Sequence, residues 1–252
     1  MENLIEAILL GIIEGITEFL PISSTGHLLI AEHWLGRRSD LFNIAIQAGA
    51  IVAVVLIYWR RLLDLNRDYA LKLGAAFLLT CIGGLAAKKL GLELPEDVAP
   101  VASALIVGGF AIFAVEWWVA GKPPEARITW TVAVVVGLAQ VLAAVFPGTS
   151  RSAATIFAAM LAGCRSRPAA TEFAFLLGIP TMFAATALES FEAAQGGSLA
   201  SEPLGELVVG FVVSAIVAFV AVKWLLVYIQ THRFTPFAWY RIGVGALLLL
   251  AL

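Results

Sequence analysis

Charged residues are scarce in this sequence: Asp, Glu, Lys and Arg together make up 13% of its 252 residues. Soluble domains carry roughly a quarter charged residues and about half apolar ones. This chain is 61% hydrophobic with a mean hydropathy of +0.94, which excludes an ordinary soluble protein and indicates an integral membrane protein. The net charge is −2, and the sequence has neither a basic run nor an aromatic platform, so we expect no nucleic-acid partner.

Cysteine is nearly absent, with two residues in the chain. Cys81 lies inside an apolar run and Cys164 beside a basic loop, which argues against a disulfide framework. Residues 1–20 lack a basic segment followed by a small-residue cleavage site, so we expect no cleaved signal peptide.

Apolar runs dominate what is present, and six of them suit a bilayer crossing, which takes about 17–25 helical residues. They are 41–59, 69–90, 98–120, 170–188, 204–230 and the slightly short 237–252. Two further runs, 5–20 and 128–146, each end at a proline followed by small hydroxyl residues. A short second helix is expected after each break, at 25–35 and 152–163. A helix, a tight turn and a returning helix form a re-entrant hairpin, which is tolerated where protein shields it or it faces water.

The two broken runs also resemble each other. The first, from Gly11, reads GIIEGITEFLPISSTGH, and the second, from Gly137, reads GLAQVLAAVFPGTSRSAAT. A shift of half the chain length, 126 residues, aligns Gly11 with Gly137 and Pro21 with Pro147. The same shift aligns Ser24 with Ser150. Matching helix breaks in two halves of a membrane protein indicate a binding site near the bilayer midplane.

The fold expected from these features is one all-α integral membrane domain over residues 1–252. Its repeats, 1–126 and 127–252, would each hold one re-entrant hairpin, at about 5–35 and 128–163, followed by three crossings. Because three is odd, the second repeat starts on the opposite side of the membrane. We therefore predict an inverted-topology repeat with six transmembrane helices, in which the two broken turns meet inside.

Lysine and arginine in short loops predict the orientation, because they are enriched on the cytoplasmic side. One side of the predicted topology carries Arg60, Arg61, Arg67, Lys122, Arg127, Arg165, Arg167 and Arg233. The other carries Arg37, Arg38, Lys88 and Lys89, together with acidic loops around 93–97 and 195–206. The first side is expected to be cytoplasmic, which places both termini outside.

Glu14 and Glu18 are four residues apart, so they share one face of the first broken helix. Inside a membrane, two such carboxylates repel each other and lose hydration unless a cation or a proton neutralises one of them. They are therefore candidates for function, and the alternative is a hairpin so shallow that both face ordinary water. The second run has Gln140 and Ala144 at the aligned positions, so any chemistry would be divided unequally between the halves.

Arg151 is the only charged residue between Ile128 and Cys164. A guanidinium in such a stretch needs an anionic partner, and its planar fork fits a carboxylate or a phosphate. Charge alone leaves two interpretations open, namely a phosphate site and a structural ion pair with Glu14 or Glu18.

Small hydroxyl residues gather where each returning helix should begin. They are Ser23, Ser24 and Thr25 in the first half, and Thr149, Ser150 and Ser152, next to Gly148, in the second. Helix N-termini offer free N–H groups and a positive dipole end, which bind anions, although Ser and Thr at these positions often serve only as caps. With Arg151 and His27 beside them, these groups suggest a phosphate cradle.

His27 lies three residues after Ser24, within one helical turn. The pair could act as base and nucleophile, or as acid and phosphate ligand. A single buried histidine is more often only hydrogen-bonded to its surroundings.

The two motifs resemble the signatures of a known family, the bacterial undecaprenyl pyrophosphate phosphatases of the bacitracin-resistance (BacA/UppP) type. The resemblance rests on Glu14-x-x-x-Glu18 with the Ser-Ser-Thr-Gly-His run at 23–27, and on Pro147-Gly-Thr-Ser-Arg-Ser-Ala-Ala-Thr155. Further matching stretches are 46–49, 58–62, 171–177 and 236–241.

The resemblance implies hydrolysis of undecaprenyl pyrophosphate to the monophosphate and inorganic phosphate, which recycles the lipid carrier of peptidoglycan synthesis and confers bacitracin resistance. It also implies a divalent cation, Mg²⁺ or Ca²⁺, held by Glu14 and Glu18, and a site open to the periplasmic side of the bacterial cytoplasmic (inner) membrane. The family's roles fall on Glu14, Glu18, Ser24, His27, Ser150, Arg151 and Thr155, with no departure at these positions.

The reaction hypothesis assigns the pyrophosphate oxygens to Arg151, to the hydroxyls of Ser150 and Thr155, and to amides after Pro147. Ser24 is the first choice of nucleophile, with His27 as acid or base. Attack by water or by His27 stays open. So do the metal, the lipid chain length and the oligomeric state, for which a homodimer is one option.

The chief rival is an inverted-repeat transporter or flippase for an anionic lipid, since broken helices in inverted repeats are a transporter pattern. A second rival, the type 2 phosphatidic-acid phosphatases, requires a histidine some residues after its Ser-Arg turn. The next histidine after Arg151 is His232, so this class is set aside. A structural scaffold without chemistry agrees least with where the charges fall.

Overall fold

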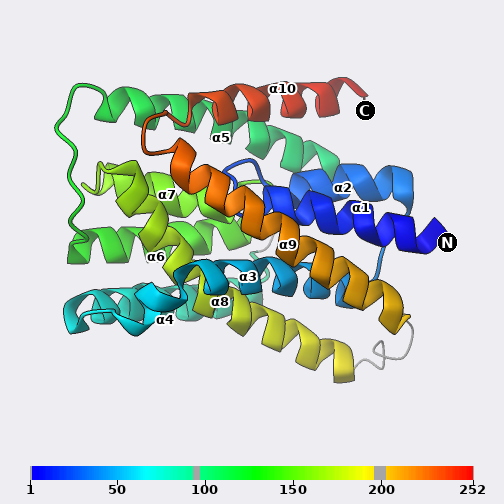
Figure 1. Cartoon of the computed structure of the whole chain (residues 1–252). Coiled ribbons are helices and arrows are strands. Elements are labelled where there is room, and N and C mark those ends of the chain that lie inside the picture. Colours follow the sequence, from blue (N-terminus) through cyan, green and yellow to red (C-terminus); the bar gives the residue numbers. More distant parts are fainter. Residues whose placement is uncertain (1, 93–96, 196–202, 252) are drawn as a thin grey trace.

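The structure, a computed structural model, describes residues 2–92, 97–195 and 203–251. Within these ranges every regular element is an α-helix, which confirms the predicted all-α class (Figure 1). The helices are α1 (Glu2–Thr17), α2 (Ser24–Leu35), α3 (Asp40–Leu63), α4 (Arg67–Lys89), α5 (Val98–Val119), α6 (Trp130–Val145), α7 (Arg151–Leu161), α8 (Arg167–Gln195), α9 (Leu204–Tyr228) and α10 (Thr235–Ala251). The predicted acidic loops lie partly outside the described residues, at 93–96 and 196–202.

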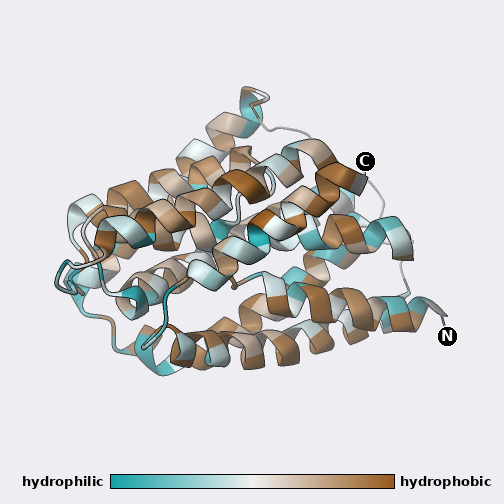
Figure 2. Ribbon diagram, turned by 90° about the horizontal axis from the view of Figure 1, so that it is seen from above, coloured by the Kyte–Doolittle hydropathy of each residue, from teal (hydrophilic) through white to brown (hydrophobic). Residues whose placement is uncertain are grey.

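Five of these helices, α3, α4, α5, α8 and α9, are long and apolar enough to cross a membrane, and α10 is apolar but shorter. Large apolar side chains such as Trp117, Ile82 and Val220 are exposed along the helices, and Figure 2 shows hydrophobic residues covering their lengths. Exposed apolar surface on this scale marks contact with lipid. The protein is therefore a multi-pass, all-α membrane protein.

The helix bounds follow the predicted apolar runs closely, with one clear difference in α8. This helix continues beyond the predicted end at Leu188, as far as Gln195. Residues with good helix propensity, such as Glu189 and Glu192, extend a helix without being apolar, so hydropathy alone underestimates its length.

Loop residues at the helix starts act as caps. The side chains of Ser39, Asn66 and Thr129 accept hydrogen bonds from the amides of the third residue after each, at the starts of α3, α4 and α6. Caps of this kind stabilise a helix by about 1 kcal/mol each. They explain why these helices start where the polar loops give way to apolar runs.

The broken helices pack in a matched way against the rest of the bundle. Helix α1 lies along α9, and α6 lies along α4. A Cβ atom on Gly11 would lie 2.8 Å from the carbonyl oxygen of Gly210, and one on Gly137 would lie 2.9 Å from that of Ala76. The two aligned glycines therefore allow the same close approach in each half.

The basic loops gather at one end of the bundle. There, the side chain of Glu116 in α5 forms an ion pair with Arg167 at the start of α8, and Arg61 in α3 pairs with Glu172 in α8. Arg38 lies at the other end, where it pairs with Glu6 and Glu206. Both chain termini also lie at that second end (Figure 1). The basic loops predicted to share a side therefore do so, whereas the acidic loops lie largely outside the described residues.

Candidate active site

Each broken helix resumes after a serine with an unusual backbone conformation. Ser23 has φ of 74° and Ser150 has φ of 70°, and no other described non-glycine residue has a positive φ. The Ser23 hydroxyl accepts from the amide of Gly26, and the Ser150 hydroxyl accepts from that of Ala153. The two serines are therefore equivalent N-caps of α2 and α7.

This equivalence corrects the alignment by a constant shift, which paired Ser24 with Ser150. The cap Ser23 is the second residue after Pro21, whereas the cap Ser150 is the third residue after Pro147, so the second turn is one residue longer. Beyond the turn the true counterpart of Ser24 is therefore Arg151, and each is the first residue of its helix. A constant shift cannot register one extra residue in a turn.

Glu18 joins the two halves. Glu18 is 7% exposed and directly follows the last residue of α1. One carboxylate oxygen accepts a hydrogen bond of 2.6 Å from the Ser24 hydroxyl, and the other forms an ion pair with Nη2 of Arg151. Of the two candidate acids, the ion-pair partner of Arg151 is thus Glu18.

Glu14 is completely buried, and neither of its carboxylate oxygens has a hydrogen-bond partner. It lies one helical turn before Glu18, whose amide donates to the Glu14 carbonyl oxygen. The burial of both acids is incompatible with the alternative in which they face ordinary water. A buried carboxylate without partners is costly unless a proton or a cation neutralises it.

The aligned position in the second half is filled differently. Gln140 is buried, but its amide nitrogen donates to the Thr181 hydroxyl at 2.8 Å, and its oxygen accepts from the Thr80 hydroxyl at 3.3 Å. The neutral residue is satisfied where Glu14 is not. The two halves therefore differ in chemistry, with the unpartnered group on the N-terminal side.

His27 is held by two hydrogen bonds. Its Nδ1 lies 2.6 Å from the carbonyl oxygen of Ser23, and its Nε2 lies 2.7 Å from the hydroxyl of Tyr240 in α10. Because a carbonyl can only accept, Nδ1 carries a proton, and when the ring is neutral Nε2 accepts from the Tyr240 hydroxyl. The side-chain partner of the Ser24 hydroxyl is therefore Glu18, and the side-chain partner of the His27 ring is Tyr240.

Tyr240 is a site residue that the motifs did not single out. Its ring stacks on that of His27, with 5.5 Å between centroids and 3° between planes. It lies far from both hairpins in sequence, and its one signal was its place in the stretch 236–241 that matched the family.

The hydroxyls of Ser150, Ser152 and Thr155 contact protein groups. The Ser152 hydroxyl donates to the Leu20 carbonyl oxygen at 3.0 Å and lies 3.1 Å from that of Ser150, and the Thr155 hydroxyl donates to the Arg151 carbonyl oxygen at 2.8 Å. The hydrogen bond from Ser152 to Leu20 ties α7 to the first turn. Thr25, Gly148 and Thr149 also lie in or beside the two turns, so all the predicted site residues come from one region of the fold.

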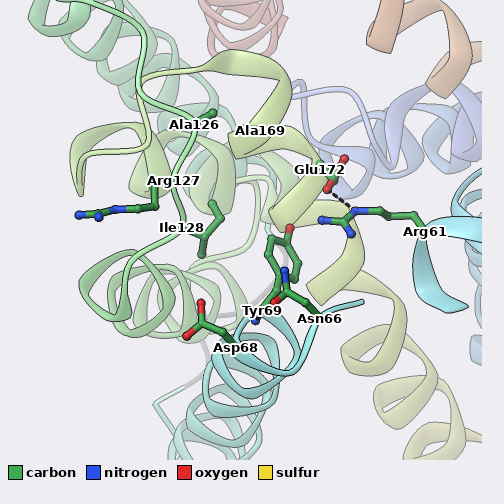
Figure 3. A pocket seen from close by; sticks show the side chains of 9 residues that line it. All are labelled: Arg61, Asn66, Asp68, Tyr69, Ala126, Arg127, Ile128, Ala169 and Glu172. Carbon is green, nitrogen blue, oxygen red and sulfur yellow. Dashed lines mark hydrogen bonds and ion pairs between the residues drawn. The ribbon is translucent and has the colours of Figure 1, made fainter. Parts of the chain in front are cut away.

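A separate cavity of about 270 Å³ lies at the basic end of the bundle (Figure 3). The guanidinium of Arg61 faces Glu172 there, 2.9 Å from its carboxylate, and lies over the ring of Tyr69. Arg127 lines the same cavity but points away from this pair. The predicted site residues lie elsewhere, at the two turns.

The fold and site together define a multi-pass membrane protein in which two broken helices bring a buried acid pair and an arginine to one point. Residues 7–247 match the sequence model of the family described as bacitracin resistance protein BacA. The chain belongs to this family.

Individual relatives are similar over nearly their whole length. The chain is 62% identical over 253 residues to an undecaprenyl-diphosphatase of Rhizobium etli, with 97% of this chain and 96% of the relative covered. It is 57% identical over 259 residues to one of Xanthomonas axonopodis pv. citri, with 99% and 97% covered. It is 54% identical over 257 residues to one of Xylella fastidiosa, with 99% and 98% covered.

Proposed function

We infer that this protein is an undecaprenyl-diphosphatase, which hydrolyses undecaprenyl pyrophosphate to undecaprenyl phosphate and inorganic phosphate. The reaction recycles the lipid carrier of peptidoglycan synthesis and confers resistance to bacitracin. Family membership and the names of the relatives support this activity. The structural observation that carries it is the meeting of Ser24 and Arg151 on the buried carboxylate of Glu18.

The topology we propose has six crossings and two re-entrant hairpins, α1–α2 and α6–α7, in two inverted repeats over 1–126 and 127–252. The matched packing of α1 on α9 and of α6 on α4 supports it, as do the equivalent caps Ser23 and Ser150. The sixth crossing is α10, whose 17 residues are at the lower limit for a span of about 17–25.

The basic end of the bundle faces the cytoplasm in this proposal, and the protein lies in the bacterial inner membrane. Arginines in the loops at that end follow the positive-inside rule. The hairpin α1–α2 then enters from the periplasmic side, from which the site is reached. The apolar walls between crossings admit the prenyl chain from the bilayer.

Arg151 binds the pyrophosphate directly. A guanidinium has five N–H donors, and the ion pair with Glu18 uses Nη2 of Arg151. The side chain of Arg151 is 31% exposed, against 5% for that of Glu18, so further donors remain accessible to phosphate oxygens. The N-termini of α2 and α7 add free amides and two positive dipole ends.

The hydroxyl residues divide into two groups in this scheme. Thr25 and Thr149, with the backbone of Gly148, contribute donors at the surface of the cradle. Ser23, Ser150, Ser152 and Thr155 are bonded to protein groups and keep the two turns in shape around the phosphate.

Ser24 is the nucleophile in the proposed reaction, and Glu18 accepts its proton. The Ser24 oxygen bonds to the terminal phosphorus while the bond to the bridging oxygen breaks and undecaprenyl phosphate leaves. Water then attacks the phosphoserine, which releases inorganic phosphate and restores the hydroxyl. His27, three residues further along α2, exchanges protons with the leaving group or with water, and Tyr240 orients it.

The divalent cation, Mg²⁺ or Ca²⁺, is assigned to Glu14 and Glu18. The two unpartnered oxygens of Glu14 fit a hard cation, which prefers oxygen ligands. Among the described residues no group of three or more acidic, histidine or cysteine side chains forms a complete metal site, so phosphate oxygens and water would supply further ligands. When bound, the cation offsets negative charge on the acids and on the phosphate.

Phosphate release by the purified protein tests this function against the flippase alternative. In detergent, with Mg²⁺ and undecaprenyl pyrophosphate, we expect stoichiometric release of inorganic phosphate and undecaprenyl phosphate. A flippase without phosphatase activity would release none, yet would equilibrate the intact lipid across a reconstituted vesicle.

A further inference from the structure

Arg241 in α10 is one of the largest completely buried side chains in the protein, at 0% exposure. Its guanidinium donates to five backbone carbonyl oxygens, at distances of 3.1 to 3.3 Å. Among the described residues it forms no ion pair with a carboxylate. A buried arginine without a carboxylate is unusual, and here the helix breaks supply its partners.

The carbonyl groups come from three places. Nη1 donates to Pro21 in the first broken turn, and Nη2 donates to Gly148 and Thr149 in the second. A break in a helix leaves such carbonyl groups without their usual partners, which is costly away from water. One planar fork therefore satisfies both breaks at once.

The third place is α5, which supports both turns. Arg241 also donates to the carbonyl oxygens of Ala104 and Leu105 in that helix. A Cβ atom on Gly108 would overlap Nη2 of Arg241, so glycine leaves room for the guanidinium there. The second turn also approaches α5 closely, since a Cβ atom on Gly148 would lie 2.8 Å from the carbonyl oxygen of Val101 in that helix.

The two caps beside these contacts are held in a costly conformation. Ser23 and Ser150 both lie in the left-handed region, which is unfavourable for a non-glycine residue and persists only where its surroundings enforce it. Arg241 bonds to Thr149, immediately before one cap, and to Pro21, two residues before the other.

We propose that Arg241 is a positioning residue that ties the two broken turns to each other and to α5, and thereby sets the relation of Ser24 to Arg151 across Glu18. The positive charge of Arg241 also lies close to the N-termini of α2 and α7, where it favours the binding of an anion. The catalytic consequence rests on the proposed phosphatase function, whereas the structural role does not.

Hydrogen exchange of the purified full-length protein in detergent tests the structural role. Arg241→Lys keeps the charge but loses the fork, and Gly108→Ala keeps the arginine but displaces it. In both we expect the amides of 22–27 and 148–155 to exchange at least about tenfold faster together, with α3 and α9 unchanged. The control is Gly245→Ala, which crowds the same α5–α10 interface at Ala102, Ile106 and the Cβ of Leu105, with no atom of the guanidinium among its three nearest neighbours; its turns should stay protected.

Kinetics with undecaprenyl pyrophosphate complete the test. We expect kcat to fall about 10²-fold in Arg241→Lys and Gly108→Ala, because misplaced groups lose near-attack geometry, while KM changes much less and Gly245→Ala stays near wild type. Exchange that rises in one turn alone, in neither, or throughout the protein would overturn the proposal. So would failure of both variants to fold, since that would assign Arg241 to general stability. Absence of phosphate release by the wild type would instead refute the proposed function and leave the exchange result intact.

Discussion

Ser24 and Arg151 occupy the same position in the two halves of this protein. Each is the first residue of the helix that resumes after a proline break, and each contacts one oxygen of the Glu18 carboxylate. Two helices that start after similar breaks thus place a hydroxyl and a guanidinium on the two oxygens of one carboxylate. This arrangement suits phosphoryl transfer, which needs a nucleophile and a cation at the same phosphorus.

Replacing Arg151 should abolish most of the activity. In Arg151→Ala we expect kcat/KM for phosphate release to fall about 10³-fold, since a donor to developing charge is lost. Arg151→Lys should recover little of it, because an ammonium lacks the fork. The matched control is Arg165→Ala at the basic end, where that side chain donates to the Pro123 carbonyl oxygen. An Arg151→Ala protein with most of its activity would contradict the phosphate assignment.

Ser24→Ala should be inactive, and should carry no trapped phosphate. We expect at least about a 10³-fold loss of kcat, and wild type incubated with terminally labelled substrate and quenched in denaturant at neutral pH, where phosphoserine and phosphohistidine both persist, should show label on Ser24. Ser39→Ala, which removes the cap of α3, should remain active and label normally. Label on His27, or on neither residue, would move the nucleophile to histidine or to water.

Glu14→Gln should separate stability from activity. The substitution removes a buried carboxylate without hydrogen-bond partners, so the thermal midpoint should rise, while activity should be lost with the cation site. The wild type should lose activity to a chelator and regain it with Mg²⁺ or Ca²⁺. A Glu14→Gln enzyme that kept full, chelator-sensitive activity would remove Glu14 from the metal site.

Tyr240→Phe tests the orientation of His27. It keeps the stacked ring but removes the hydroxyl that donates to Nε2. A hydrogen bond worth about 1 kcal/mol corresponds to a loss of roughly fivefold in kcat/KM. The control is Tyr228→Phe, because the wild-type Tyr228 hydroxyl donates to the Arg233 carbonyl oxygen at the basic end. Equal activities of the two variants and the wild type would leave Tyr240 without a role.

Cysteine labelling tests the orientation. With the native cysteines replaced, Lys122→Cys in the basic α5–α6 loop should react with an impermeant maleimide only after the inner membrane is permeabilised. Arg37→Cys, in the α2–α3 loop at the other end, should react in spheroplasts without permeabilisation. The reverse pattern would invert the proposed topology and turn the site towards the cytoplasm.

The sequence by itself determined the helices, the two breaks and the positions of the hydroxyl-rich turns, because apolar runs, prolines and helix-capping residues act locally. It could not tell whether Arg151 pairs with Glu14 or with Glu18, since both acids share one helix face and only packing places the second hairpin against them. Nor could it register the extra residue in the second turn, which makes Arg151 the counterpart of Ser24. The contacts of Tyr240 and Arg241 emerged only from the tertiary structure, although both residues lie in the stretch 236–241 that resembles the family. Their partners are more than half the chain length away or are backbone carbonyl groups, and a backbone carbonyl has no signature in sequence.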